Sequence, residues 1–329
     1  MKNFVHVKPQ NLKEASQLTG NNWKDVLPYA GGTDLLGLMK DGIENPDKLI
    51  DLKALPGMDK IIYTPGKGLQ IGALVTIAEI AEHELINKKY TVLGQAAKEV
   101  ASPQLRNQGT IGGTICQRPR CWYFRGDFHC LRKGGDVCFA VEGENKYHCI
   151  IGGGPCFIVH PSDIAVALLA LDASVTVFSG KKLQHIPLKE FFVLPAKLVT
   201  RENILQPGEI ITGILVPDTL AGTRSGYLKL KERGAWDFAT VSAAAVLQIQ
   251  QDIVQTARVA LGGVAPIPWL EKQLSSQLKG LTTKPDNLEQ IVSTALKDAE
   301  PLEQNAYKIP MAHNLIKRLI ESSLRSQRE

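Results

Sequence analysis

The sequence has no long hydrophobic run, since no apolar stretch approaches the roughly 20 residues that a membrane-spanning helix requires. The opening MKNFVHVKPQNL also lacks the apolar region of a signal peptide. We therefore expect no membrane insertion and no export signal on this chain, and we predict a cytoplasmic location.

Charge of one sign is not concentrated anywhere in the chain. The net charge of +5 at pH 7 is spread along the sequence, without a basic stripe interleaved with base-stacking aromatic residues, so we expect no nucleic acid partner. Internal repeats and low-complexity segments are also absent. The hydrophobic fraction of 44% and the charged fraction of 22% are typical of a globular protein, and 329 residues suffice for two domains.

Cysteine is absent outside residues 116–156. All six cysteines lie inside that stretch: Cys116, Cys121, Cys130, Cys138, Cys149 and Cys156. The segment QRPRCWYFRGDFHCLRKGGDVC is rich in glycine, arginine and aromatic residues, a composition typical of a loop wrapped around a ligand. We interpret residues of about 116–156 as an insertion between regular elements, in which one local structure needs thiolates.

Three structures could use these thiolates: disulfides, a zinc site or an iron–sulfur cluster. Disulfides need an oxidising compartment and usually serve small domains that lack a core. Structural zinc sites use close C-x2-C pairs, whereas the gaps here run Cys121-x8-Cys130-x7-Cys138-x17-Cys156. A [4Fe-4S] cluster accepts four thiolates at irregular spacing. Neighbouring cations could offset its charge, and aromatic residues could exclude water: Arg118, Arg120, Arg125, Arg132 and Lys133, with Trp122, Tyr123 and Phe124. The spacing alone does not decide among the three.

The rest of the chain predicts two domains of mixed α and β structure. In the first, short β-branched strands alternate with helices, such as one that begins at the N-cap Asn11 and ends at Gly20, and another over 92–101. Proline, glycine and small polar residues cluster at 217–226, which predicts domains over 1–220 and 221–329. The second domain should contain antiparallel strands, two of them joined by a tight turn at Gln251 and Asp252. Three helices are expected there, at about 268–279, 286–299 and 311–325.

Neither a Rossmann GxGxxG motif nor a Walker loop is present, but the first domain has two other glycine loops. They read AGGTDL at 30–35 and GTIGGT at 109–114. Each alone is typical of a plain turn. Together they indicate a nucleotide cofactor, because successive backbone N–H groups can converge on phosphate oxygens. We interpret Asp163 first as a helix cap, and its carboxylate could also accept hydrogen bonds from a ribose or an adenine. We interpret Lys229 first as a solvated charge, or alternatively as a cation beside a reduced flavin.

These motifs resemble the flavin-binding medium subunits of the molybdenum hydroxylases, the family of xanthine dehydrogenase, carbon monoxide dehydrogenase, aldehyde oxidoreductase and 4-hydroxybenzoyl-CoA reductase. AGGTDLLGLMK is similar to the family's first FAD pyrophosphate loop and ASPQLRNQGTIGGT to its second. PSDIAVALLALDA resembles the segment that follows, and KERGAWDFATVSAAA with RVALGGVAP the C-terminal domain. The cysteine stretch resembles the subset with an extra [4Fe-4S] cluster, especially the flavoprotein subunit of three-subunit bacterial aldehyde oxidoreductases.

The resemblance implies an α+β fold. A two-lobed FAD-binding domain of the vanillyl-alcohol oxidase/PCMH type would carry the inserted cluster loop, and a smaller C-terminal domain of the CO dehydrogenase flavoprotein type would contain an antiparallel sheet. By the same resemblance FAD contacts fall on Tyr29, Ala30, Gly31, Gly32, Thr33, Asp34, Leu35, Leu36, Val100, Thr110, Gly113, Thr114, Asp163, Lys229 and Phe238. Phe238 would lie over the isoalloxazine, and Thr114 stands where many relatives have asparagine. The cluster ligands fall on Cys121, Cys130, Cys138 and Cys156, which leaves Cys116 and Cys149 without a role.

The function implied is that of an oxidoreductase subunit: it would carry FAD and a [4Fe-4S] cluster in a heterotrimer and transfer electrons, with aldehyde oxidation favoured and no catalytic side chain of its own. A molybdopterin-binding large subunit and a small [2Fe-2S] subunit would be partners, because this chain has neither centre. The external acceptor would be a protein such as ferredoxin rather than NAD. Alternatives are a 4-hydroxybenzoyl-CoA reductase subunit, a stand-alone flavin oxidase, or a nucleotide-binding protein with a zinc loop. A signal-bearing partner could also carry the chain to the periplasm.

Overall fold

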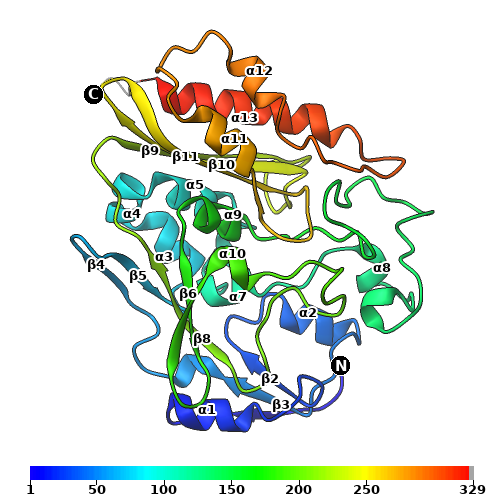
Figure 1. The fold of residues 1–329 in the computed structure, drawn as a ribbon. Helices are drawn as coiled ribbons and strands as arrows, with labels where there is room; N and C mark the ends of the chain where they lie inside the picture. Colours follow the sequence, from blue (N-terminus) through cyan, green and yellow to red (C-terminus); the bar gives the residue numbers. More distant parts are fainter. Residues whose placement is uncertain (326–329) are drawn as a thin grey trace.

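The N-terminal lobe is built on a small parallel sheet. The structure is a computed structural model that describes residues 1–325 (Figure 1). The sheet has three strands in the order β1-β3-β2. The elements of this lobe are β1 (Val5–Val7), α1 (Leu12–Leu18), β2 (Val26–Tyr29), α2 (Leu35–Lys40), β3 (Lys48–Asp51) and the 3-10 helix η1 (Leu52–Ala54). The predicted N-cap of α1 is confirmed, because the Asn11 side chain accepts a hydrogen bond from the N–H of Glu14 at 2.9 Å.

A second lobe follows, with five strands in the order β4-β5-β8-β6-β7. Its elements are β4 (Ile61–Thr64), β5 (Gly68–Gly72), α3 (Ile77–Glu82), α4 (Glu84–Lys89), α5 (Thr91–Glu99), α6 (Pro103–Arg106), α7 (Ile111–Ile115), α9 (Asp163–Ala170), β6 (Ser174–Phe178), β7 (Leu183–Pro187), α10 (Leu188–Phe191) and β8 (Ile210–Val216). Every residue of α9 is buried. Apart from Asp163 at its start, the helix is apolar on all sides, which is typical of the centre of a core.

The cysteine segment lies between α7 and α9 and has little regular structure. It contains only α8 (Trp122–Arg125) and the 3-10 helix η2 (Leu131–Lys133). Phe124 and Cys130 pack against Leu38 of α2 in a small core of their own. The segment therefore rests on the helix that directly follows the first glycine loop.

The C-terminal part forms an antiparallel sheet in the order β12-β11-β10-β9. Its elements are β9 (Thr223–Leu230), β10 (Val241–Gln250), β11 (Ile253–Gly262), β12 (Trp269–Leu270), α11 (Lys272–Leu278), α12 (Leu288–Val292) and α13 (Lys308–Leu324). The tight turn is confirmed, since Gln251 and Asp252 have φ of +50° and +60°. The predicted helix start at 268 is wrong, because residues 269–270 pair with β11 as a strand. The helices predicted over 286–299 and 311–325 are in fact α12, which is shorter, and α13, which begins three residues earlier.

This sheet is covered by helices on both faces. Helices α5 and α9 of the second lobe contact one side of it, while α11 and α13 contact its strands from the C-terminal part (Figure 1). Two hydrophobic cores result, one centred in the first 216 residues and one between the sheet and the last helices. Within residues 1–325 every helix is too short or too polar to cross a bilayer.

Candidate functional site

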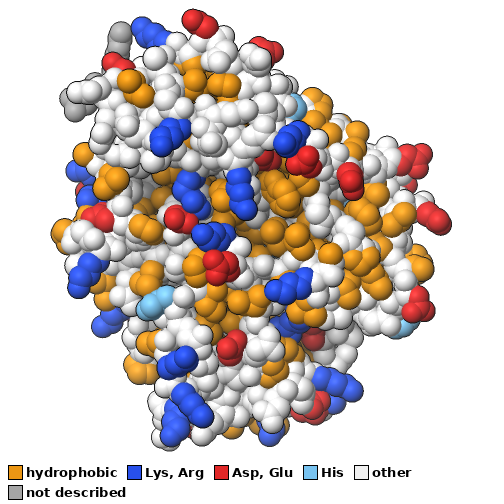
Figure 2. All heavy atoms as spheres, viewed as in Figure 1, with side chains coloured by type: hydrophobic (Ala, Val, Ile, Leu, Met, Phe, Trp, Pro, Cys, Tyr) orange, Lys and Arg blue, Asp and Glu red, His pale blue; other side chains and the backbone are white. Residues whose placement is uncertain are grey.

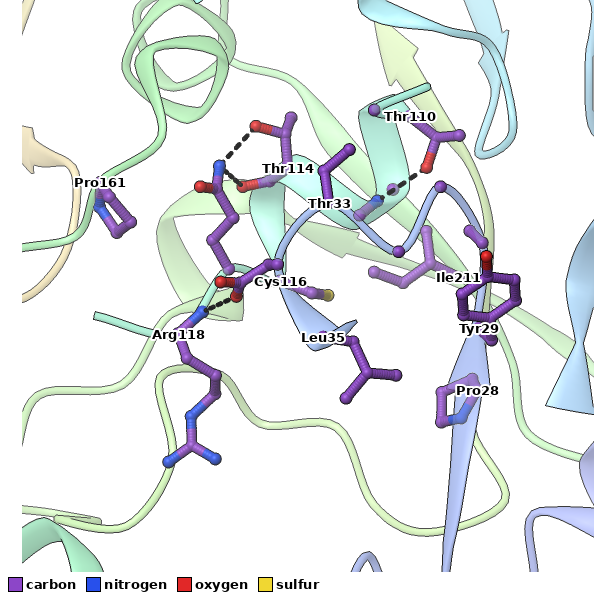
Figure 3. Close-up of a pocket in the computed structure, with 18 of the residues that line it drawn as sticks. Pro28, Tyr29, Thr33, Leu35, Thr110, Thr114, Cys116, Arg118, Pro161 and Ile211 are labelled. Atoms are coloured by element: carbon purple, nitrogen blue, oxygen red, sulfur yellow. Dashed lines mark hydrogen bonds between the residues drawn. The ribbon is translucent and has the colours of Figure 1, made fainter. Parts of the chain in front are cut away.

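A cavity of about 570 Å³ opens where the two lobes meet, and both glycine loops line it (Figure 3). Its size lies in the range of roughly 300–1,000 Å³ that is common for small-molecule sites. The structure brings most of the expected FAD contacts to its wall: Tyr29, Ala30, Gly31, Gly32, Thr33, Asp34, Leu35, Val100, Thr110, Gly113, Thr114, Asp163 and Phe238. Leu36 and Lys229 do not line it.

The first loop leaves the end of β2 and presents unused backbone donors. Gly31 must be glycine here, because a Cβ would overlap the carbonyl oxygen of Gln108 in the second loop. Gly32 has φ of +70°, a left-handed conformation that favours glycine. Among residues 1–325 no hydrogen-bond acceptor is found for the N–H groups of residues 31–34. Four neighbouring donors without partners at a cavity wall suit an anion such as phosphate.

The second loop is held by its own side chains. The Thr110 hydroxyl accepts a hydrogen bond from the N–H of Gly113 at 3.2 Å and begins α7 (Figure 3). The Thr114 hydroxyl accepts a hydrogen bond from the Gln117 amide at 2.7 Å. Gln117 therefore brings an amide to this part of the cavity wall.

Asp34 connects the first loop to the cysteine segment. Its carboxylate accepts hydrogen bonds from the backbone N–H of Arg118 and from the Arg125 side chain, both at 2.8 Å, and it forms an ion pair with Arg120 at 2.9 Å. The negative charge in a loop suited to anions is thus compensated by the segment that follows α7. Asp34 lies on the cavity wall, but its side chain is engaged by protein groups.

Asp163 and Lys229 form a buried pair beside the cavity. The Asp163 carboxylate accepts hydrogen bonds from the Tyr227 hydroxyl at 2.5 Å and from the Lys229 amine at 2.8 Å. Burial raises the pKa of Asp163, and the Lys229 charge opposes that rise. Two expectations are corrected here: Ser162, not Asp163, caps α9, and the Lys229 side chain is only 1% exposed rather than solvated.

Aromatic side chains stand at the mouth of the cavity, on the loop between β9 and β10. Phe238 is 43% exposed, and the Arg120 guanidinium lies 5.1 Å from its ring centroid. Trp236 has φ of +53° and donates its N–H to the carbonyl of Ala101 at 3.2 Å. This loop therefore places aromatic surface where the ring end of a long cofactor could lie.

A second, smaller cavity is lined by Cys121, Cys130, Cys138 and Cys156, and Cys116 and Cys149 lie outside it. In the described part of the chain, all six cysteines are free of disulfides. Over the same residues no three His, Cys, Asp or Glu side chains are gathered to hold a metal ion. A single metal ion needs its ligands gathered around one point. In a [4Fe-4S] cubane each of the four irons binds a different thiolate, so the ligands lie farther apart. The four thiols line one cavity, and the cluster stays a prediction.

The polar neighbours of these thiols favour a thiolate at one of them. The Arg132 guanidinium donates a hydrogen bond to the Cys156 sulfur at 3.4 Å. The hydrogen bond from Cys138, with Arg132 nearby, holds the pKa of Cys156 below its usual value. By contrast, burial raises the pKa of Cys121 to about 11, and the His148 ring nitrogen lies 3.2 Å from its sulfur.

Sequence reasoning missed Glu202. Its carboxylate is 3% exposed, and it pairs with Arg132 at 2.6 Å and with Arg118 at 3.0 Å. The same Arg118 also pairs with Glu44 at 2.7 Å. The only signal in the sequence was an acid in the loop TRENILQ, a pattern that many solvated acids share.

Comparison with known proteins gives a consistent result along the whole chain. Residues 2–219 match the family model described as the FAD binding domain in molybdopterin dehydrogenase. Residues 226–323 match the CO dehydrogenase flavoprotein C-terminal domain.

Similar proteins cover nearly the full length. The aldehyde oxidoreductase FAD-binding subunit PaoB of Escherichia coli (strain K12) is 38% identical over 316 residues, which is 95% of each chain. The carbon monoxide dehydrogenase medium chain of Hydrogenophaga pseudoflava is 27% identical over 97% of this chain and 96% of its own. A solved carbon monoxide dehydrogenase from the same organism, which lacks the Mo-pyranopterin moiety of the molybdenum cofactor, superposes with a TM-score of 0.77 at 26% identity, over 97% of this chain and 96% of that chain. This chain therefore belongs to the FAD-binding medium subunits of the molybdenum hydroxylase family of oxidoreductases.

Proposed function

We propose that this chain is the FAD and [4Fe-4S] electron-transfer subunit of a heterotrimeric molybdenum hydroxylase that oxidises aldehydes. The observation that carries the proposal is the pairing of two sites. A cavity walled by both glycine loops lies beside a cavity lined by four free cysteines. The likeness to the aldehyde oxidoreductase subunit of Escherichia coli over 95% of the chain supports the choice of reaction.

The residues present fit FAD. The free N–H groups of residues 31–34 would hold the pyrophosphate, with Thr110 and Gly113 of the second loop opposite them. Val100 and Phe238 would flank the isoalloxazine end. When bound, the flavin supplies the redox chemistry, and the protein orients it and limits access of water. We extend the proposal to the other expected contacts at the wall, Tyr29, Leu35, Thr114 and Asp163, whereas Lys229 would act through Asp163.

We propose that Cys121, Cys130, Cys138 and Cys156, which line the cysteine cavity, would hold a [4Fe-4S] cluster. Phe124, Leu131 and Ile158 provide apolar wall beside the thiols, and Arg132 supplies positive charge. A cluster there would carry single electrons, with its potential set by hydrogen bonds and solvent access. Residues 1–220 would form a PCMH-type domain that binds FAD and carries the cluster loop, and residues 221–329 would form a second domain that covers the flavin.

The surface of the cysteine segment is consistent with partner subunits. Large hydrophobic side chains are exposed along it, and they gather on the side of the molecule where α8 lies (Figure 2): Trp122, Phe128, Val137, Phe139, Val141 and Tyr147. Apolar patches of this kind are typical of surfaces that another protein covers. We propose a molybdopterin-binding large subunit and a small [2Fe-2S] subunit as partners, with ferredoxin or a similar protein as the external acceptor.

Co-purification and metal analysis test the proposal. We expect the tagged chain to bring down a molybdopterin subunit and a small ferredoxin-like subunit. It should contain one FAD and about four irons with about four acid-labile sulfides. One zinc without sulfide, or a pure and active homo-oligomer that oxidises substrate alone, would contradict the proposal.

A single cysteine substitution separates the two cofactors. Cys121→Ser removes one proposed ligand, so we expect iron and sulfide to be lost while the folded chain still takes up FAD. Flavin absorbance and iron content of the same preparation measure this. Cys116→Ser is the matched control, because Cys116 lies outside the thiol cavity and should leave iron content unchanged.

A further inference from the structure

A chain of hydrogen bonds and ion pairs joins the thiol cavity to the first glycine loop. Arg132 donates to the Cys156 sulfur at 3.4 Å and to Glu202 at 2.6 Å. Glu202 in turn pairs with the Arg118 side chain at 3.0 Å. The backbone N–H of Arg118 donates to Asp34 at 2.8 Å. Every link from the sulfur to the loop is therefore a direct contact.

The side chains at the centre of this chain of hydrogen bonds and ion pairs are shielded from water. The side chains of Arg132 and Glu202 are 1% and 3% exposed, and that of Arg118 is 17% exposed. Charges in such surroundings interact more strongly than charges in water, and removal of one leaves its partner buried and unpaired. Movement of the segment around Cys156 would therefore disturb Glu202 and, through it, Arg118.

Through Asp34, this chain of hydrogen bonds and ion pairs can affect the binding of an anion at the first glycine loop. Its carboxylate lies in the loop whose free N–H groups face the large cavity, and its partners Arg118, Arg120 and Arg125 all come from the cysteine segment. If the segment shifted, a bare carboxylate would remain beside the site for the diphosphate, and the two negative charges would repel each other.

We propose that Asp34 and Glu202 are positioning residues that couple the two sites, so that cluster insertion strengthens FAD binding. The inference rests on the proposed function, because it takes FAD and a [4Fe-4S] cluster as the two occupants. Linkage requires the effect to be reciprocal, and couplings of this kind typically change affinity by about 5–150-fold. Each occupant would thus help to retain the other during assembly.

The test measures the Kd of FAD by flavin fluorescence on the deflavinated full chain, once with the cluster loaded and once with it depleted under anaerobic conditions. Iron and sulfide per chain report loading independently. We expect the Kd to rise by about 5–150-fold on cluster depletion. In Glu202→Gln that ratio should fall toward one, because the link between Arg132 and Arg118 loses its charge.

Two further variants keep the test decisive. Glu232→Gln is the matched control: Glu232 also binds the cysteine segment, through Lys146 at 2.8 Å and Tyr147 at 2.6 Å, but it does not lead to the glycine loop, so the ratio should persist. Asp34→Asn should bind FAD more tightly than the natural chain when both lack the cluster, because it has no bare carboxylate to repel the diphosphate. This variant replaces Glu202→Gln in the test if Glu202→Gln does not fold. A ratio of one in the natural chain, the natural ratio in Glu202→Gln, or cluster-free Asp34→Asn that binds FAD no more tightly than the cluster-free natural chain overturns the coupling. Failure of the natural chain to take up FAD or iron overturns the proposed function instead.

Discussion

At the scale of single residues, the pair of Asp163 and Lys229 has a structural consequence that can be measured. Both side chains are almost fully buried, at 6% and 1% exposed. Lys229→Met leaves a buried carboxylate with only the Tyr227 hydroxyl, so we expect the free energy of unfolding to fall by about 3–5 kcal/mol in urea titrations.

The matched control for that prediction is a lysine in an exposed pair. Lys317 lies 2.9 Å from Glu289, and the two side chains are 36% and 85% exposed. Lys317→Met should therefore cost at most about 1 kcal/mol. Equal small losses in both variants would show that the buried pair does not stabilise the fold.

His160 makes the stability sensitive to acid. Burial lowers its pKa from 6.5 to about 4, and in the described part of the chain its Nε2 has no hydrogen-bond partner. Between these two values the unfolded chain binds more protons than the folded one, so stability contributed by neutral His160 is present above pH 6.5 and is lost as pH falls toward 4.

The substitution His160→Gln tests that sign, because glutamine does not titrate. We expect the natural chain to lose stability relative to the variant as pH falls, by up to about 1.4 kcal/mol per pH unit, in urea titrations at several pH values. A constant difference between the two proteins across this range would contradict the assignment to His160.

What the sequence could predict at this scale depends on the kind of residue. Gly31 and Gly32 lie at the cavity wall, as their glycine motif indicates, because loop geometry is local, and Thr110 lies there as the family resemblance implies. The burial of Lys229 and Glu202 could not be predicted. The sequence alone predicts that a charged side chain is exposed to solvent, because a partner far away in the sequence cannot be recognised before the fold is known.

At the scale of elements, α13 holds the end of the cysteine segment. The amine of Lys308, at the start of this helix, donates to the carbonyls of Tyr147, His148 and Gly263 at 2.8, 3.0 and 2.7 Å. Asn305, just before the helix, donates to the carbonyl of Cys149 at 3.1 Å. Lys308 thus satisfies two backbone acceptors of the cysteine segment and one that follows β11.

Lys308→Met should loosen that loop. The carbonyls of Tyr147 and Gly263 would lose this donor, and that of His148 would keep only Asn305. We therefore expect a loss of roughly 3 kcal/mol and faster hydrogen exchange at the amides of residues 145–150. Tyr307→Phe is the control, since the Tyr307 hydroxyl makes one exposed bond to the carbonyl of Lys146 at 3.0 Å. Unchanged exchange in Lys308→Met would mean that the loop is held without this helix.

Helix starts and turns can be predicted from the sequence where strong signals lie within a few residues. The capped start of α1 and the turn at Gln251 and Asp252 were predicted because side-chain capping and left-handed turn residues act within a few positions. The strand at residues 269–270 was missed because two residues become a strand only when β11 lies beside them. Its apolar side chains otherwise continue a helical pattern into α11.

At the scale of the whole molecule, the two predicted domains share one sheet. Tyr227 of β9, Ala244 of β10 and Ala260 of β11 belong to the core of the first part, while Val241 and Leu261 of the same sheet belong to the core of the last part. The sequence boundary near 220 describes the order of the elements along the chain. Because both cores need the same sheet, we infer that they stabilise each other.

This inference predicts one cooperative unit. Leu93 of α5 and Leu274 of α11 are fully buried in different cores, and truncation of either to alanine should cost about 2–5 kcal/mol. If the cores unfold together, Leu93→Ala will speed the slowest hydrogen exchange in β10 and β11, and Leu274→Ala will do the same in β5 and β8. Effects confined to the mutated side of the sheet would show that the cores unfold separately. In that case the shared sheet would be a contact surface between independent domains.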